Sequence, residues 1–208
     1  MLYFLWTGDQ KKVREQIRTG LDRVGVERLM PQMYRGGAGS LIVLGVEDSA
    51  RAALHAIPRR AFGVDTALYY LFNAELYRYD GAAQPARAYA DSARVLLERL
   101  QQVRPDEWLY RSQLGAANAL LGRRTAAIEE ARSAVEVLPL EKDALGGQMP
   151  IWLLATTYTM VGEKDSAVAQ LRTLLALPAL VTTASLRVDP AMAPLRGYPA
   201  FEQLVSTR

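Results

Sequence analysis

Hydrophobic and polar positions follow a helical period along this chain, and glycines interrupt the pattern at regular intervals. The intervals between Gly8, Gly45, Gly81, Gly122 and Gly162 are 37, 36, 41 and 40 residues. Each glycine follows an apolar stretch and precedes an amphipathic one. A glycine at such a boundary suits the left-handed turn that ends one helix before the next begins. This spacing predicts a series of helix pairs.

The positions that follow each glycine in register predict the buried face of the second helix in each pair. Offsets of five, nine and twelve residues from a glycine lie on one face of a helix. All but one of the residues at these offsets are apolar, and many are alanine. They are Val13, Ile17, Gly20, Ala50, Leu54, Ile57, Ala86, Ala90, Ala93, Ala127, Ala131, Ala134, Ala167, Leu171 and Leu174.

The first helix of each pair carries a small residue between larger ones. A small residue lets two helix backbones approach closely, while its larger neighbours fill the remaining space. Tyr70 and Tyr77 flank one of these positions, so we expect them to pack between helices. The small residues stand seven positions before the last four glycines and are Ala38, Ala74, Gly115 and Ala155.

Signals for β-strands are almost absent, so the predicted fold is all-α. Residues 181–183 form the only β-leaning stretch, and it is too short to build a sheet. The glycine intervals exceed a period of roughly 34 residues. We expect the extra length in a long helix over residues 85–103 and in a loop over residues 140–147.

This pattern resembles the tetratricopeptide repeat, and residues 108–139 match it best. Arg111, Asn118 and Ala131 stand at the positions where the family has tryptophan, tyrosine and phenylalanine. The resemblance implies a right-handed superhelical solenoid of antiparallel helix pairs, with about four full repeats after a partial first one. It assigns residues 1–180 to the repeat array and residues 181–208 to a capping segment. The matching residues are Leu114, Gly115, Gly122, Ala127, Ala131, Ala134 and Pro139.

The C-terminal segment also resembles one that follows the repeats of bacterial multidomain proteins. In those proteins a protein-kinase or DNA-binding effector domain precedes the repeats, so the resemblance implies a larger bacterial signalling or regulatory protein. Prolines at positions 190, 194 and 199 cannot continue a helix, so the chain should wrap across the last helix pair. We expect Leu195, Phe201 and Leu204 to cover an apolar face there, as a terminal cap does.

Composition removes several kinds of site. The chain has no cysteine and a single histidine, His55, which excludes disulfides, thiolate metal sites and multi-histidine metal sites. We find no catalytic motif and expect no enzyme activity, no cofactor and no metal. Residues 36–40 are glycine-rich but lack the lysine of a phosphate-binding loop, so we interpret them as a place of close helix packing.

Charge and hydropathy restrict the expected partners. The net charge is +3 and the basic runs are short, so we expect no direct binding to nucleic acid. No apolar run approaches the roughly 20 residues that span a bilayer, so we expect no membrane association and a cytoplasmic location. The apolar start of the chain, residues 1–6, indicates an interrupted helix pair. Its exposed edge offers a site for self-association.

The resemblance places a partner-binding groove on the first helices of the pairs. Aromatic residues and arginine, which binding hot spots favour, occur among these positions. We therefore expect a protein or peptide partner in this groove. Carried over one by one, the groove residues are Leu71, Glu75, Arg78, Tyr79, Ser112, Ala116, Ala119, Trp152, Thr156 and Thr159.

Three functions stay open at this point. The first is a non-catalytic protein-interaction or scaffolding module. The second is a sensor that binds a small molecule and regulates an attached effector domain, which an enclosed pocket near Glu75 and Arg78 would favour. The third is an α-helical enzyme whose carboxylates come from distant repeats, which requires two carboxyl groups facing each other across a cleft.

Overall fold

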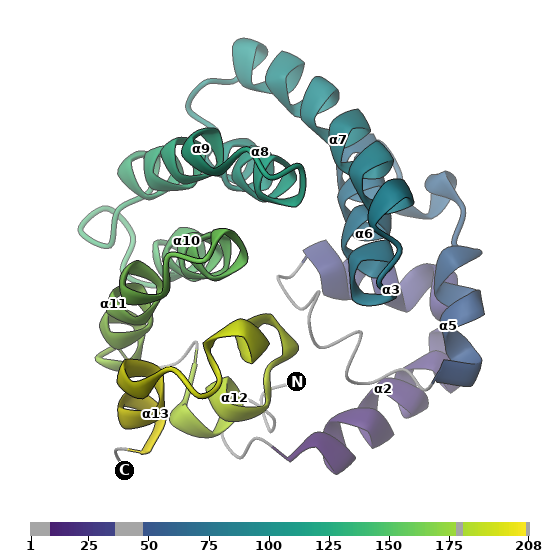
Figure 1. The fold of residues 1–208 in the computed structure, drawn as a ribbon. Helices are drawn as coiled ribbons and strands as arrows, with labels where there is room; N and C mark the ends of the chain where they lie inside the picture. Colours follow the sequence, from purple (N-terminus) through teal and green to yellow (C-terminus); the bar gives the residue numbers. More distant parts are fainter. Residues whose placement is uncertain (1–8, 36–47, 178–180, 207–208) are drawn as a thin grey trace.

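The computed structural model describes residues 9–35, 48–177 and 181–206, and within these ranges every regular element is a helix (Figure 1). The all-α prediction is therefore confirmed for this part of the chain. Residues 1–6 and 36–40, for which we predicted an interrupted helix pair and close helix packing, lie outside the described ranges. The helices are α2 (Gln10–Val24), α3 (Val26–Arg35), α5 (Asp48–His55), η1 (Arg59–Phe62), α6 (Thr66–Tyr79), α7 (Ala83–Val103), α8 (Trp108–Leu120), α9 (Arg124–Val137), α10 (Gln148–Val161), α11 (Lys164–Leu175), α12 (Thr183–Val188), η2 (Pro190–Leu195) and α13 (Pro199–Ser206).

Glycines end the first helix of three successive pairs. Gly122 has a φ of 77°, which a residue with a side chain rarely adopts. Its amide donates to the Ala119 carbonyl, and the next amide, that of Arg123, donates to the Asn118 carbonyl. The same two bonds recur at Gly81 and Gly162. The repeated turn aims each following helix back along the one before it.

The predicted apolar faces form the interior. The eight alanines and leucines at the offsets of five, nine and twelve residues after Gly81 and Gly122, and at nine and twelve after Gly162, are at most 5% exposed. Ala167, five residues after Gly162, is fully buried as well. Because these side chains are mostly alanine, neighbouring helices lie close together. The buried-face prediction is confirmed here.

Helices α8 and α9 approach each other closely at Gly115. A Cβ added at Gly115 would lie 3.0 Å from the Ala127 carbonyl oxygen and 3.2 Å from the Ala131 amide nitrogen. Both contacts are to backbone atoms, which cannot rotate away as a side chain can. Gly115 therefore sets the distance between these two helices, as the small residue in the first helix predicted.

The helices pack in adjacent pairs that follow one another around a curve. Helix α6 packs extensively on α7, α8 on α9 and α10 on α11. Helices of neighbouring pairs, such as α7 and α8, also contact each other. Figure 1 shows that this curve runs from α6 through α8 and α10 and returns toward the N-terminal helices. The first helices of the pairs, α6, α8 and α10, lie on its inner side.

The C-terminal segment packs against the last pair. Helix η2 contacts α10, and α13 contacts α11. Leu195 and Phe201 are at most 1% exposed within the same apolar cluster as Leu171 and Leu174 of α11. Leu204 lies partly buried at the edge of that cluster.

This segment also reaches the other end of the molecule. Val188, the last residue of α12, packs against the N-terminal cluster that includes Ile17 of α2 and Met30 of α3. The chain thereby closes into a ring of helices (Figure 1). Nothing in the local sequence pattern predicted this contact, because it joins residues far apart in the chain.

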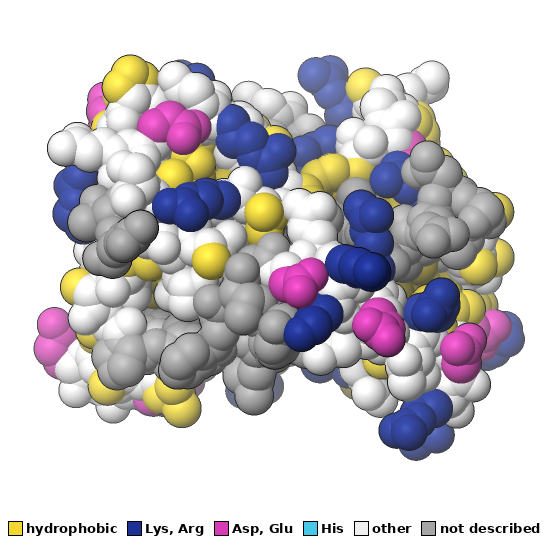
Figure 2. All heavy atoms as spheres, turned by 90° about the horizontal axis from the view of Figure 1, so that it is seen from below, with side chains coloured by type: hydrophobic (Ala, Val, Ile, Leu, Met, Phe, Trp, Pro, Cys, Tyr) yellow, Lys and Arg dark blue, Asp and Glu magenta, His cyan; other side chains and the backbone are white. Residues whose placement is uncertain are grey.

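Charged side chains of both signs are interspersed on the face shown in Figure 2, with uncharged surface between them. The described side chains on that face form no continuous basic stripe. Within the described ranges, no helix combines the length and the hydropathy that crossing a bilayer requires.

Candidate ligand-binding cavity

A cavity of about 500 Å³ lies inside the ring. Its walls come from the inner helices α6, α8 and α10, from the end of α3 and from η2. Pockets that bind small molecules typically measure about 300–1,000 Å³. The cavity is only partly enclosed, so it is accessible from solvent.

Nine of the ten groove positions that the family resemblance placed on the first helices line this cavity. Thr159 does not. Its side chain is 2% exposed, and its hydroxyl donates to the Ala155 carbonyl at 2.9 Å. Thr159 is therefore the one predicted groove position that the cavity lining does not include. The nine lining positions are Leu71, Glu75, Arg78, Tyr79, Ser112, Ala116, Ala119, Trp152 and Thr156.

Several lining residues were not expected from the sequence. Tyr34 and Arg35 come from the end of α3, and Ala191 and Pro194 come from η2. Both elements line the cavity only because the ring closes, so no local sequence pattern predicts their place there. The others lie on or beside the inner helices, where the helical period could have indicated them. They are Leu68, Trp108, Leu109, Gln113, Leu120, Gly146, Met149, Leu153 and Met160.

One wall of the cavity carries a hydrogen-bonded carboxylate. The Tyr34 hydroxyl donates to the Glu75 carboxylate. Burial raises the pKa of Tyr34 well above its ordinary value, so this hydroxyl keeps its proton. Burial also raises the pKa of Glu75, against the opposing effects of Arg78 and the Tyr34 hydrogen bond. Water would stabilise the ionised carboxylate better than this environment does.

Arg78 lies beside this pair. Its guanidinium carbon sits 4.1 Å from the centre of the Tyr79 ring, and its guanidinium also forms a hydrogen bond with the Tyr79 side chain. Burial raises the pKa of Tyr79 to about 12, and the neighbouring Glu75 charge acts in the same direction. The Arg78 Nε atom is buried and makes no hydrogen bond. The positive charge of Arg78 is thus held by stacking as well as by hydrogen bonding.

Two further polar side chains that line the cavity each have a buried atom without a hydrogen-bond partner. The Ser112 Oγ and Gln113 Oε1 atoms are buried and have no hydrogen-bond partner. Both residues lie on α8 and line the cavity. Leaving a buried polar atom unpaired costs about 1–3 kcal/mol, so such atoms are exceptions that require a reason.

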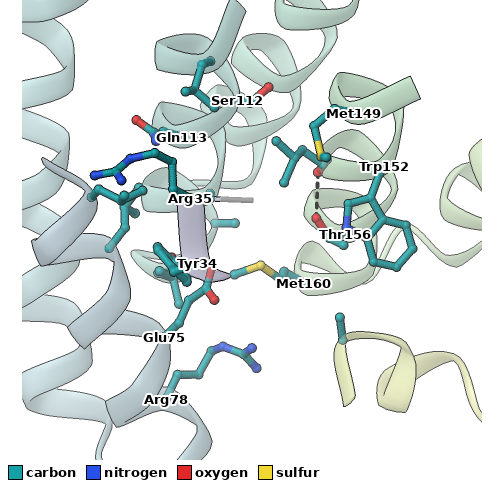
Figure 3. A pocket seen from close by; sticks show the side chains of 18 of the residues that line it. Tyr34, Arg35, Glu75, Arg78, Ser112, Gln113, Met149, Trp152, Thr156 and Met160 are labelled. Atoms are coloured by element: carbon teal, nitrogen blue, oxygen red, sulfur yellow. Dashed lines mark hydrogen bonds between the residues drawn. The ribbon is translucent and has the colours of Figure 1, made fainter. Parts of the chain in front are cut away.

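The opposite wall is apolar. Figure 3 shows Met149 and Trp152 of α10 across the cavity from Tyr34 and Glu75. Trp152 is 7% exposed and belongs to the C-terminal apolar cluster as well as to the cavity wall. The Thr156 hydroxyl donates to the Leu153 carbonyl at 2.8 Å, which leaves its methyl group for apolar contact. The cavity is therefore polar at α6 and apolar at α10.

Carboxylates are scarce in the lining of this cavity. Glu75 is the only carboxylate among the described residues that line the cavity. The structure therefore does not bring together the paired carboxyl groups that the enzyme alternative requires in this cavity. Within the described ranges, no group of three or more His, Cys, Asp or Glu side chains is arranged to hold a metal ion.

Other residues singled out in the sequence lie between helices. Tyr77 stacks on Tyr89 with ring centres 5.5 Å apart. His55 packs against Tyr77, with ring centres 4.4 Å apart. The His55 Nε2 atom lies 2.6 Å from Asp80 Oδ2. Tyr70 is half-buried and packs against the cluster that joins α6 to α8. These contacts tie α5, α6 and α7 together.

Compared with protein-family models, with curated proteins and with solved structures, the chain matches none of them.

Proposed function

We propose that this chain is a non-catalytic binding protein that holds a small, largely apolar molecule in the cavity inside its ring of helices. The cavity of about 500 Å³ is the observation that carries this proposal. It has the size of a ligand pocket, a mostly apolar lining and a few convergent polar groups. An extended peptide in an open groove fits less well, because α3 and η2 contribute to the walls.

The architecture that fits these helix pairs is a right-handed superhelix of the tetratricopeptide type, whose concave surface becomes the cavity wall. The recurring glycine turn and the buried alanine face support this interpretation. Helix-pair arrays bind their partners on the concave side. A role in regulating an attached kinase or DNA-binding domain in a bacterial signalling protein would follow from ligand binding at this site.

A neutral fluorescent probe tests the proposal. N-phenyl-naphthylamine brightens when it enters an apolar site, so titration should give saturable binding to one site per chain. Ala116 lines the cavity, and Ala116→Phe should fill it and weaken probe binding at least tenfold. Ala88→Phe adds the same ring at an exposed position of α7 and should leave the affinity unchanged. Equal binding by wild type and Ala116→Phe would remove the cavity from the proposal.

A protein partner is the second candidate. The cavity is partly open, so one side chain of a partner could enter it while the rest of the partner contacts the rim. In that case Tyr79→Ala combined with Trp152→Ala would abolish capture of the partner. The same double variant should also lose the fluorescent probe, since both residues line the cavity.

A further inference from the structure

The polar side of the cavity presents a charged acceptor, the Glu75 carboxylate, whose hydrogen-bonding capacity the protein uses only in part. A carboxylate has two oxygens with about four lone-pair positions, and the structure gives Glu75 one hydrogen bond, from Tyr34. Its side chain is largely buried but keeps some exposed surface, and it lines the cavity. In Figure 3, Glu75 and Tyr34 lie together on the side of the cavity that faces Met160. A ligand group that enters can therefore reach this carboxylate.

The two arginines of the cavity are already engaged. Arg78 is stacked on Tyr79 and hydrogen-bonded to it. Arg35 donates from Nη2 to the Phe62 carbonyl at 3.3 Å. Figure 3 shows the Arg35 guanidinium directed away from Met149 and Trp152. The Arg78 Nε atom has no hydrogen-bond partner, but it is buried, whereas the Glu75 side chain is partly exposed in the cavity wall.

Resting on the proposed ligand-binding function, we infer that the ligand is a cationic amphiphile whose ammonium head binds Glu75 and whose apolar body lies against Met149 and Trp152. An ammonium group supplies up to three hydrogen-bond donors and a positive charge. Charge-assisted hydrogen bonds are roughly twice as strong as neutral ones. The apolar body matches the α10 wall, where the described side chains offer no charge.

The desolvated state of the carboxylate supports this choice. Burial raises the pKa of Glu75 in the free protein, which means that the ionised form lacks the stabilisation that water would give. A bound ammonium group would supply the missing stabilisation. A carboxylate ligand would instead bring a second negative charge beside Glu75, and the nearby Arg78 charge already acts on Glu75 and Tyr79.

A matched series of ligands tests the head group. Decylamine, decanol and decanoate share one alkyl chain and differ only in a positive, neutral or negative head at neutral pH. Each competes with N-phenyl-naphthylamine for the cavity. We expect decylamine to bind at least about tenfold more tightly than decanol, with decanoate the weakest of the three.

Glu75→Gln isolates the charge. Glutamine keeps the size of the side chain and an oxygen that accepts the Tyr34 hydrogen bond, so the fold should be retained, which circular dichroism verifies. Decylamine should then bind no better than decanol, while decanol affinity stays constant. Glu136→Gln removes one negative charge at an exposed position of α9 and should preserve the amine preference.

The outcomes separate the two proposals. Failure of the probe to bind wild-type protein, or probe binding that Ala116→Phe leaves unchanged, removes the cavity function itself. Probe binding with equal affinities for the three ligands, or with decanoate preferred, overturns the ammonium assignment alone. An amine preference that persists in Glu75→Gln also overturns it, because the charge recognised would then lie elsewhere.

Discussion

Phe201 anchors the C-terminal segment, and its removal is the sharpest test of how the last helix pair is completed. Its side chain is 1% exposed within a cluster that contains Leu171, Leu174 and Leu186. Truncating a buried phenylalanine to alanine costs about 3–5 kcal/mol, because apolar contact is lost and a cavity remains. For a chain of this size each kcal/mol lowers Tm by roughly 2–4 °C. Phe201→Ala should therefore lower Tm by roughly 6–20 °C.

Urea and thermal unfolding, followed by circular dichroism, measure this change. Leu145→Ala is the control, since Leu145 is 69% exposed and its truncation should change stability by no more than about 0.5 kcal/mol. The segment also supplies Ala191 and Pro194 to the cavity wall, so Phe201→Ala should weaken probe binding as well. A decrease in the free energy of unfolding below about 1 kcal/mol would refute the reasoning, because truncating a fully buried phenylalanine costs more than that.

Three further predictions concern helix spacing, pH and the N-terminal helices. Gly115→Val should cost at least about 1–3 kcal/mol in urea unfolding, because its Cβ meets backbone atoms of α9, and near-native stability would contradict the close approach. Glu75→Gln should stabilise the ligand-free protein increasingly as pH rises above 4.5, the ordinary pKa of Glu75. The raised folded-state pKa means that native protein binds more protons than unfolded chain in that window, so wild type loses stability there. Thermal unfolding across pH checks this, and a difference that shrinks with rising pH would reverse the sign. Burial alone would raise the pKa of Asp80, but hydrogen bonds from His55 and Arg51 hold this pKa below its ordinary value. Asp80→Asn should accordingly lower the free energy of unfolding by about 0.5–1 kcal/mol at neutral pH and by less at acidic pH, and an effect independent of pH would count against the charge pairing.

The periodic part of the fold was predictable because it is local. A glycine five residues before an alanine, with apolar residues at helical spacing beyond it, fixes both the turn and the buried face. Gly122, Ala127 and Ala131 therefore behave as the pattern indicates. Long-range closure was not predictable in this way. The contact of Val188 with the N-terminal cluster depends on the sum of small rotations between successive helix pairs.

The residues of the cavity also fall into those that the repeated pattern predicts and those that depend on long-range contacts. Glu75, Ala116 and Thr156 were placed on the inner side by their positions in the repeated pattern, and the structure brings them around one cavity. Thr159 follows Thr156 by less than one helical turn and points into the packing instead. Tyr34 was not predicted to line the cavity. Its hydrogen bond to Glu75 arises because α3 reaches α6, which no spacing in the sequence specifies.

The ring of helices should hold a ligand with its head group at Glu75. A crystal structure of the chain with decylamine tests it most directly. We predict the ammonium nitrogen at hydrogen-bond distance, about 2.7–3.2 Å, from a Glu75 carboxylate oxygen. The alkyl chain should lie against Trp152 and Met149. An empty cavity at saturating decylamine, with the amine bound only on the outer surface of the helices, would contradict the account.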